Sequence, residues 1–173
     1  MKIAIMGYSG CGKSTLAQKL GKKYGIPVLH LDRVQFLPGW QERDRAEAVA
    51  LTASFMEQDG WVIDGNYTAF LQEERAEQAD LIIYMAFGRF VCLHRAMKRY
   101  RMYRGMERDS MAEGCTEKMD AEFIWWILYK GRTAEKRRHY QRLRMRYPEK
   151  FVILRNQQEL DRFCRKNGLP DGC

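Results

Sequence analysis

The chain has 173 residues, enough for one domain with one sizeable hydrophobic core. Apolar residues make up 46% and charged residues 30%, a balance that is typical of globular proteins and excludes long disordered segments. The longest apolar run, residues 123–129, is far shorter than the ~20 residues of a membrane span. The apolar start leads into a loop motif rather than a cleavage site, so we expect a cytoplasmic protein.

The formal net charge of +8 is concentrated in one stretch of the chain. Residues 86–146 hold 16 Lys and Arg against 7 Asp and Glu, whereas the remaining residues hold 14 against 15. Such a basic stretch attracts polyanions, either nucleoside triphosphates or nucleic acid, and charge alone does not choose between them.

Short apolar runs alternate with helix-length amphipathic segments, without internal repeats or linkers. We expect strands over residues 2–6, 27–31, 61–64, 81–87 and 151–154. Helices are expected over residues 14–24, 43–58, 69–78, 90–103, 119–147 and 157–166, with a loop at 105–117. The alternation predicts one α/β domain over residues 1–173, in which helices cover both faces of a five-stranded parallel sheet.

The strongest functional signal follows the first expected strand. The run GYSGCGKS, residues 7–14, fits the P-loop pattern G-x-x-x-x-G-K-[ST] at every fixed position. Its glycines let backbone N–H groups cradle phosphates, and the start of the next helix adds partial positive charge. Lys13 can reach the β- and γ-phosphates, and Ser14 can hold Mg²⁺. The predicted phosphate-binding residues are Gly7, Ser9, Gly10, Cys11, Gly12, Lys13, Ser14 and Thr15.

The rest of the sequence narrows the class of P-loop protein. It has no N-K-x-D motif for reading guanine, which disfavours a Ras-like GTPase. The chain is also too short for a ring-forming ATPase with an additional helical domain. A small kinase that uses ATP and Mg²⁺ fits the length and layout best.

Acidic residues follow two further strands. Ligands of open α/β sheets bind beyond the carboxyl ends of the strands. Asp32 can therefore meet the acceptor as hydroxyl partner or base, or it can cap a helix or turn. Asp64, if its strand lies beside the first, can hold the water shell of Mg²⁺, or Asp64 and Gly65 can form a turn that leaves the sheet. We interpret His30 as structural.

Two other segments are candidates for contacts around the site. Residues 36–40, FLPGW, form either a lip that lines an acceptor pocket or an ordinary packed loop. Arginines flank residues 105–117, and Arg95 and Arg99 share one helix face because they are four residues apart. Arginines placed on a transferring phosphoryl group accelerate transfer, so we expect the cluster to contact phosphate. Trp125 and Trp126 are expected in helix core or lid packing.

Several segments resemble adenylate-kinase-like P-loop kinases, and more closely the small bacterial proteins known as DNA topology modulation proteins. The matching segments are GYSGCGKSTLA, PVLHLD, FLPGW, WVIDGNY, the R-x₃-R of Arg95 and Arg99, and MAEGCTEKMDAEFIWWI. They extend from Gly7 to Ile127 and so cover most of the chain.

The resemblance implies a three-layer α/β/α P-loop NTPase fold with strand order 2-3-1-4-5. It implies an ATP site on the P-loop and a helical lid at about residues 100–120. Arg95 and Arg99 match the lid-side arginines of adenylate kinases. Adenine contact maps to the loop after the fifth strand, at Arg155, Asn156 and Gln157.

One departure concerns the phosphate acceptor. In adenylate kinases the Asp-Gly pair runs on into Phe-Pro-Arg, and that arginine meets AMP. Here the pair runs on into Asn66, Tyr67 and Thr68. The contact is therefore missing, or it comes from Arg75 or Arg89. The lid also lacks a four-cysteine zinc set.

Two functions are consistent with these patterns. The first is a kinase that transfers the γ-phosphate of Mg-ATP to a nucleoside, a nucleotide or another small acceptor. The alternative is a nucleic-acid-binding regulator that uses ATP as a switch, although no helix-turn-helix or other reader motif is present. A P-loop hydrolase or non-catalytic nucleotide binder is a third interpretation.

Overall fold

A computed structural model describes residues 1–103, 111–112, 114–117 and 119–170 of the chain. The lid that we expect at about residues 100–120 falls partly outside these residues. Among them, no helix is both long and apolar enough to cross a membrane.

Within the described part of the chain, seven strands form two sheets. The strands are β1 (Lys2–Gly7), β2 (Val28–His30), β3 (Phe36–Leu37), β4 (Gln41–Glu42), β5 (Trp61–Asp64), β6 (Leu81–Met85) and β7 (Phe151–Leu154). Five of them pair in parallel in the order β2-β5-β1-β6-β7. This order corresponds to the predicted 2-3-1-4-5, because β3 and β4 belong to a separate antiparallel hairpin.

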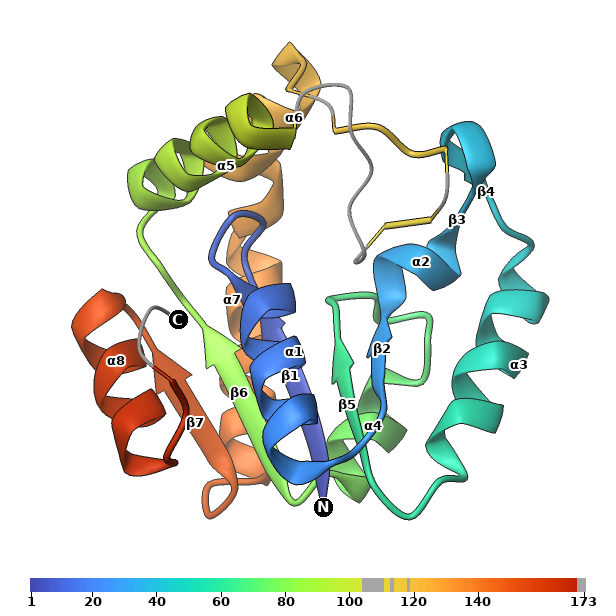
Figure 1. Cartoon of the computed structure of the whole chain (residues 1–173), viewed down its shortest axis with the longest axis vertical. Helices are drawn as coiled ribbons and strands as arrows, with labels where there is room; N and C mark the ends of the chain where they lie inside the picture. The colour runs from blue at the N-terminus through green and yellow to red at the C-terminus, as the bar shows by residue number, and fades with distance from the viewer. Residues whose placement is uncertain (104–110, 113, 118, 171–173) are drawn as a thin grey trace.

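Eight α-helices in the same described residues connect and flank the strands. They are α1 (Lys13–Tyr24), α2 (Leu31–Gln35), α3 (Arg45–Met56), α4 (Gln72–Gln78), α5 (Arg89–Tyr103), α6 (Ala121–Leu128), α7 (Ala134–Arg146) and α8 (Gln157–Lys166). In Figure 1, α1 lies in front of the sheet and α7 behind it, while α5 and α6 lie beyond the carboxyl ends of the strands. The three-layer α/β/α prediction is confirmed.

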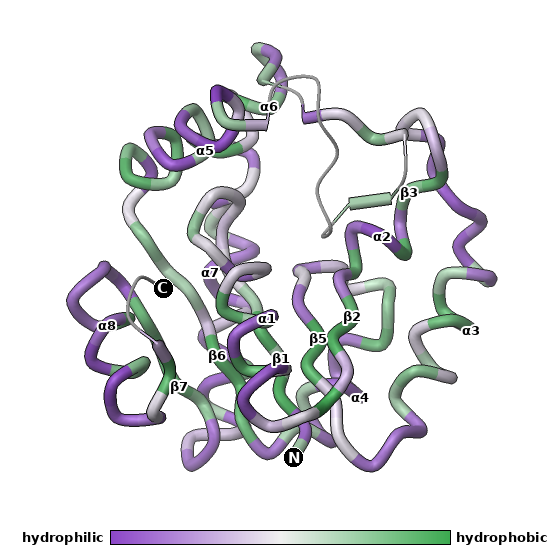
Figure 2. The backbone as a smooth tube through the Cα atoms, in the orientation of Figure 1, coloured by the Kyte–Doolittle hydropathy of each residue, from purple (hydrophilic) through white to green (hydrophobic). Residues whose placement is uncertain are grey.

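The core lies along the central strands. Ile3, Ala4, Ile5 and Met6 of β1 have no exposed surface, because β1 is paired on both edges and covered on both faces. Figure 2 shows the same distribution, with hydrophobic colour along the strands and hydrophilic colour on the outer surface of α8.

The largest difference from the expected elements is a break in the long segment 119–147. A 3₁₀ turn, Lys130–Arg132, separates α6 from α7. The backbone of Tyr129 leaves the helical region, and the side chain of Thr133 starts α7 by accepting a hydrogen bond from the N–H of Lys136. Helical periodicity continues through this break, so the sequence pattern alone suggested one helix.

The pairing of β5 with β1 and β2 brings the carboxyl ends of these three strands to the same edge of the sheet. Asp64 is opposite Ile5 on one side and opposite His30 on the other. The carboxyl ends of β1, β2 and β5 therefore meet. Gly65 then turns away with φ 143°, in close contact with Leu31.

We predict that Gly65→Ala lowers the free energy of unfolding by roughly 2–4 kcal/mol, because it adds backbone strain and overpacking. A Cβ at this position would lie 2.7 Å from Cβ of Leu31. Gly25→Ala is the matched control, since Gly25 also has positive φ but has no heavy atom within 4 Å of the added Cβ. It should cost about 1 kcal/mol. Equal losses in urea unfolding would contradict this account.

Candidate functional site

The GYSGCGKS loop connects β1 to α1 at the carboxyl edge of the sheet. The loop turns at Gly10 and Gly12, with φ values of 80° and 99°, and Gly12 is the N-cap of α1. Gly10 packs against the carbonyl of Cys92 on α5, and burial raises the pKa of the Cys11 thiol. An α-helix leaves its first N–H groups without intrahelical partners, so the start of α1 offers donors to an anion.

Lys13 curls back over this loop. Its Nζ donates to the carbonyls of Gly7, at 2.9 Å, and Tyr8, at 3.1 Å. Within the described part of the chain it has no acidic partner. Its charge is therefore held at the mouth of the loop by neutral acceptors, which a phosphate group can replace.

Ser14 and Asp64 meet beside the loop. The Ser14 hydroxyl donates to Oδ2 of Asp64 at 2.9 Å. The other carboxylate oxygen of Asp64 contacts Nδ1 of His30, and both side chains are buried. This arrangement agrees with the structural interpretation of His30, which holds Asp64 in place.

The pair fits a magnesium ion. Mg²⁺ prefers oxygen ligands and usually binds one or two protein groups together with phosphates and water. The Ser14 hydroxyl and the Asp64 carboxylate supply such oxygens next to the phosphate loop. Elsewhere among the described residues, no group of three or more His, Cys, Asp or Glu forms a metal cluster.

Asn66 fixes the start of the phosphate loop, a role that the sequence analysis missed. Its Oδ1 accepts from the N–H of Gly7 at 2.8 Å, and its Nδ2 donates to the carbonyl of Gly7 at 2.5 Å. The signal available in the sequence was the position of Asn66, two residues after the strand that was expected to lie beside β1. In the sequence, Asn66 stands out only as a departure from the adenylate kinase pattern.

Asp32 lies at the same edge of the sheet, just beyond the end of β2. The structure places it in the first turn of α2, two residues beyond the end of β2. His30, not Asp32, is the N-cap of this helix, so the capping alternative for Asp32 is not observed. Oδ1 of Asp32 accepts from the hydroxyl of Tyr67 at 2.8 Å. Burial, followed by the nearby Asp32 charge, raises the pKa of Tyr67, which keeps this donor protonated.

Arg95 lies directly against the phosphate loop. Its guanidinium donates to the carbonyl of Cys11 at 2.8 Å and to Oε1 of Gln157, and it stacks over Phe87. Gln157 belongs to the segment expected to touch adenine. Arg155 does not share this contact: it is exposed, and its N–H donates to Glu159.

Arg99 is on the same helix face but is directed elsewhere. Its Nε donates to Oε1 of Glu117 at 2.7 Å, and that carboxylate is buried. In this structure Arg99 is therefore neutralised by an acid of the segment 114–117 rather than directed at the loop.

Arg132 is the second arginine that reaches the loop. Its guanidinium lies 3.7 Å from the ring centroid of Tyr8, and its Nη1 donates to the carbonyl of Phe87. Nη2 is buried and has no hydrogen-bond partner among the described residues. The sequence placed Arg132 in the basic cluster but did not distinguish it from the other members.

Arg75, a candidate for a phosphate contact, is enclosed within the protein. It is completely buried, and it donates to the carbonyls of Phe70 and Tyr67, each at 2.8 Å. Burial lowers its pKa to about 10, so it remains charged at neutral pH. Arg75 therefore supports the chain after Asn66, and Arg89, the other candidate for a phosphate contact, lies over the ring of Tyr129.

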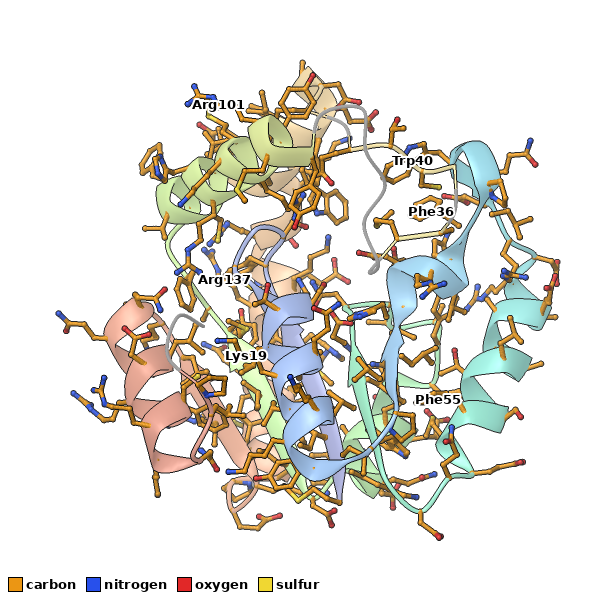
Figure 3. The ribbon with its side chains drawn as sticks, in the orientation of Figure 1. Lys19, Phe36, Trp40, Phe55, Arg101 and Arg137 are labelled. Atoms are coloured by element: carbon orange, nitrogen blue, oxygen red, sulfur yellow. The ribbon has the colours of Figure 1, made fainter. Side chains whose placement is uncertain are left out.

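The FLPGW segment forms a hairpin rather than a loop. Strands β3 and β4 flank a 3₁₀ turn, Pro38–Trp40. Nε1 of Trp40 donates to the carbonyl of Thr116, and the Cys115 thiol donates to the carbonyl of Leu37. Figure 3 shows Phe36 and Trp40 close together on this hairpin, across the carboxyl edge from α5. The hairpin thus touches the segment that carries Glu117.

The tryptophans of α6 are more exposed than expected. Trp125 and Trp126 have 51% and 41% of their surface exposed, whereas Ile127 is buried. Trp125 packs against Tyr129, and Lys136 lies over the ring of Trp126. Neither ring is packed in the core, because α6 buries Ile127 and leaves the tryptophans partly exposed. The alternative of lid packing stays a prediction.

Comparisons with known proteins agree with this fold. A family model described as isopentenyl transferase matches residues 1–41, which include the phosphate loop. The chain is 61% identical to a shikimate kinase of Flavobacterium johnsoniae over 31 residues, a match that spans only 18% of either protein.

Two solved structures are similar over most of the chain. A gluconokinase from Sinorhizobium meliloti has a TM-score of 0.52 at 17% identity, covering 95% of this chain and 87% of that one. A Thermus thermophilus protein has a TM-score of 0.53 at 16% identity, covering 96% and 95%. Together with the topology, they show a P-loop kinase-like fold.

We predict that Asn66→Ala lowers the free energy of unfolding by roughly 1–3 kcal/mol, because two partly buried groups of Gly7 lose their partner. Asn167→Ala is the control, since the amide of Asn167 makes a single bond to the carbonyl of Phe163 near the end of α8. Its loss should stay below about 1 kcal/mol. If urea unfolding gave the same loss for both variants, the claim that the two bonds between Asn66 and Gly7 stabilise the fold more than the single Asn167 bond would be wrong.

Proposed function

We propose that this protein is an ATP-dependent small-molecule kinase. The observation that carries the proposal is the meeting of Lys13, Ser14 and Asp64 at one end of the sheet. These are the three groups that a P-loop kinase needs to hold a triphosphate and its metal. The names of the matched shikimate kinase and of the structurally similar gluconokinase favour the same reaction class.

In this proposal the phosphate loop holds the triphosphate. The N–H groups of residues 7–15 bind the β- and γ-phosphates, and Lys13 exchanges its two carbonyl acceptors for phosphate oxygens. Ser14 and Asp64 hold Mg²⁺, directly or through water, and the ion neutralises charge on the phosphates. Arg95 and Gln157 border the nucleoside. Arg155, which is exposed, contacts the nucleoside only at the outer edge of this region.

The acceptor side favours a hydroxyl as the group that is phosphorylated. Asp32 is an exposed carboxylate fixed by Tyr67, so it can accept the proton of an incoming hydroxyl. A nucleoside monophosphate would need a cation for its phosphate, but Arg75 is buried among carbonyls. We therefore rank a nucleoside, a sugar or another small alcohol ahead of AMP as the acceptor. We place the reaction in the cytoplasm, as expected from the sequence.

ATP-to-ADP conversion with Mg²⁺ tests the proposal against a panel of nucleosides, sugars, small alcohols and nucleoside monophosphates. We expect a neutral hydroxyl acceptor to stimulate conversion well above the rate with water. The Lys13→Ala variant should abolish both rates. If no acceptor in the panel raised the rate while ATP remained bound, the kinase proposal would fail.

Asp32→Asn should reduce phosphoryl transfer by about 10²–10⁴-fold, the usual effect of a general base, and should leave the Kd for ATP unchanged. The amide keeps the hydrogen bond from Tyr67 but cannot accept the proton. Asp59→Asn is the matched control, because Asp59 is exposed in the turn before β5. Unchanged transfer in Asp32→Asn would remove Asp32 from the mechanism.

Nucleic-acid binding is a second candidate function, favoured by the surface of α5 and α6. Exposed Phe90, Trp125, Trp126 and Tyr129 lie in the basic stretch, where Arg89 and Lys136 stack on two of the rings. Aromatic rings among cations are typical of surfaces that bind nucleic acids. This is also where a DNA topology modulation role would be carried.

A titration with duplex DNA at several salt concentrations tests this candidate. The logarithm of the association constant should fall linearly with the logarithm of the salt concentration, with a slope of about −0.9 for each phosphate contacted. Trp126→Ala with Lys136→Ala should weaken the complex, and Lys19→Ala on α1 is the control. The absence of any complex at moderate salt would exclude the regulator function.

A further inference from the structure

A cavity of about 260 Å³ lies behind the phosphate loop. It is bordered by Tyr8 of the loop, by Tyr84 and Arg155 at the ends of β6 and β7, and by α7. Because α7 covers the face of the sheet opposite α1, the cavity is separate from the start of α1, where the triphosphate is held (Figure 1). Of the side chains that line it, only Arg155 has a place in the proposed kinase mechanism, at the outer edge of the nucleoside region.

The inner wall of the cavity is aromatic. Tyr8, Tyr84 and Tyr140 are all nearly buried. The rings of Tyr84 and Tyr140 stack with centroids 4.3 Å apart, and Tyr8 packs edge-on against Tyr84 at 5.9 Å. Burial raises the pKa of both Tyr84 and Tyr140, so their hydroxyls stay neutral and can donate hydrogen bonds. Such a wall suits a planar, largely apolar group.

The rim of the cavity is cationic. Arg137 and Arg144 lie on the same face of α7 as Tyr140, because positions 137, 140 and 144 are spaced three and four residues apart. Figure 3 shows Arg137 near the end of β6. Within the described part of the chain, neither arginine has a carboxylate partner. The third, Arg155, is 3.8 Å from Glu159, and no Asp or Glu lines the cavity.

Three guanidinium groups around one cavity repel each other unless an anion lies between them. Arginine binds carboxylate and phosphate with two parallel hydrogen bonds, which makes it the preferred partner for these groups. We propose that this cavity binds a small aromatic anion, with its ring against the tyrosines and its phosphate or carboxylate between Arg137 and Arg144. The cavity is near the lower limit of small-molecule sites, ~300–1,000 Å³, which selects a one-ring ligand over a nucleoside triphosphate.

Calorimetric titration of the full chain with phenyl phosphate and with 4-hydroxybenzoate tests the proposal. Phenol and inorganic phosphate, which each carry one half of the ligand, should bind much more weakly than phenyl phosphate. The titration is repeated with ATP and Mg²⁺ present, so that the phosphate loop is occupied. Binding that persists under this condition supports a separate site.

Arg144→Gln should raise the Kd of the bound probe by about tenfold or more, the loss expected when a charged hydrogen bond is removed. Arg138→Gln is the matched control on the same helix, because Arg138 is exposed and does not line the cavity. It should leave the Kd unchanged. Both positions are at the surface, so both variants should fold.

Two results would overturn the proposal. One is the absence of binding for both aromatic probes up to millimolar concentrations. The other is binding that disappears with ATP or with Lys13→Ala and is unaffected by Arg144→Gln, since the probe would then occupy the phosphate loop. Chemical shifts that change at Tyr84 and Tyr140 but not at Lys13 would support the assigned cavity directly.

Discussion

The carboxylate of Asp64 holds together the carboxyl end of the sheet, where the phosphate loop and the other candidate site residues lie. One oxygen accepts the hydroxyl of Ser14 at the start of α1, and the other contacts His30 at the end of β2. A single buried acid thereby connects three elements that are distant in sequence. Among the described residues it forms no ion pair with Lys or Arg, so the oxygen that faces Ser14 can take a metal ion as its cation.

The residues after Asp64 extend this connection. Gly65 turns tightly against Leu31, Asn66 fixes Gly7, and Tyr67 fixes Asp32. Arg75, buried beneath them, binds the carbonyls of Tyr67 and Phe70. The four consecutive residues 64–67 thus position both the phosphate loop and the Asp32 carboxylate. The tight turn and the hydrogen bonds of this segment are typical of sites that need fixed geometry.

Much of the fold was predictable, because it depends on local patterns. The strands at 61–64 and 151–154 and the helix at 157–166 have the bounds that periodicity indicated, and the P-loop motif is strict enough to identify its loop. The clamp by Asn66, the burial of Arg75 and the pairing of Arg99 with Glu117 were not predictable. Each is a contact between segments that only the tertiary fold brings together, and a lone Asn or Arg carries no periodic signal.

The hairpin at residues 36–42 contacts the segment 114–117, and through this segment it is connected to Arg99 on α5. Trp40 holds the carbonyl of Thr116, and the next residue, Glu117, neutralises Arg99. The side chain that pairs with Arg99 is therefore adjacent in the chain to a residue that the hairpin holds. One short segment thus bridges α5 and the hairpin.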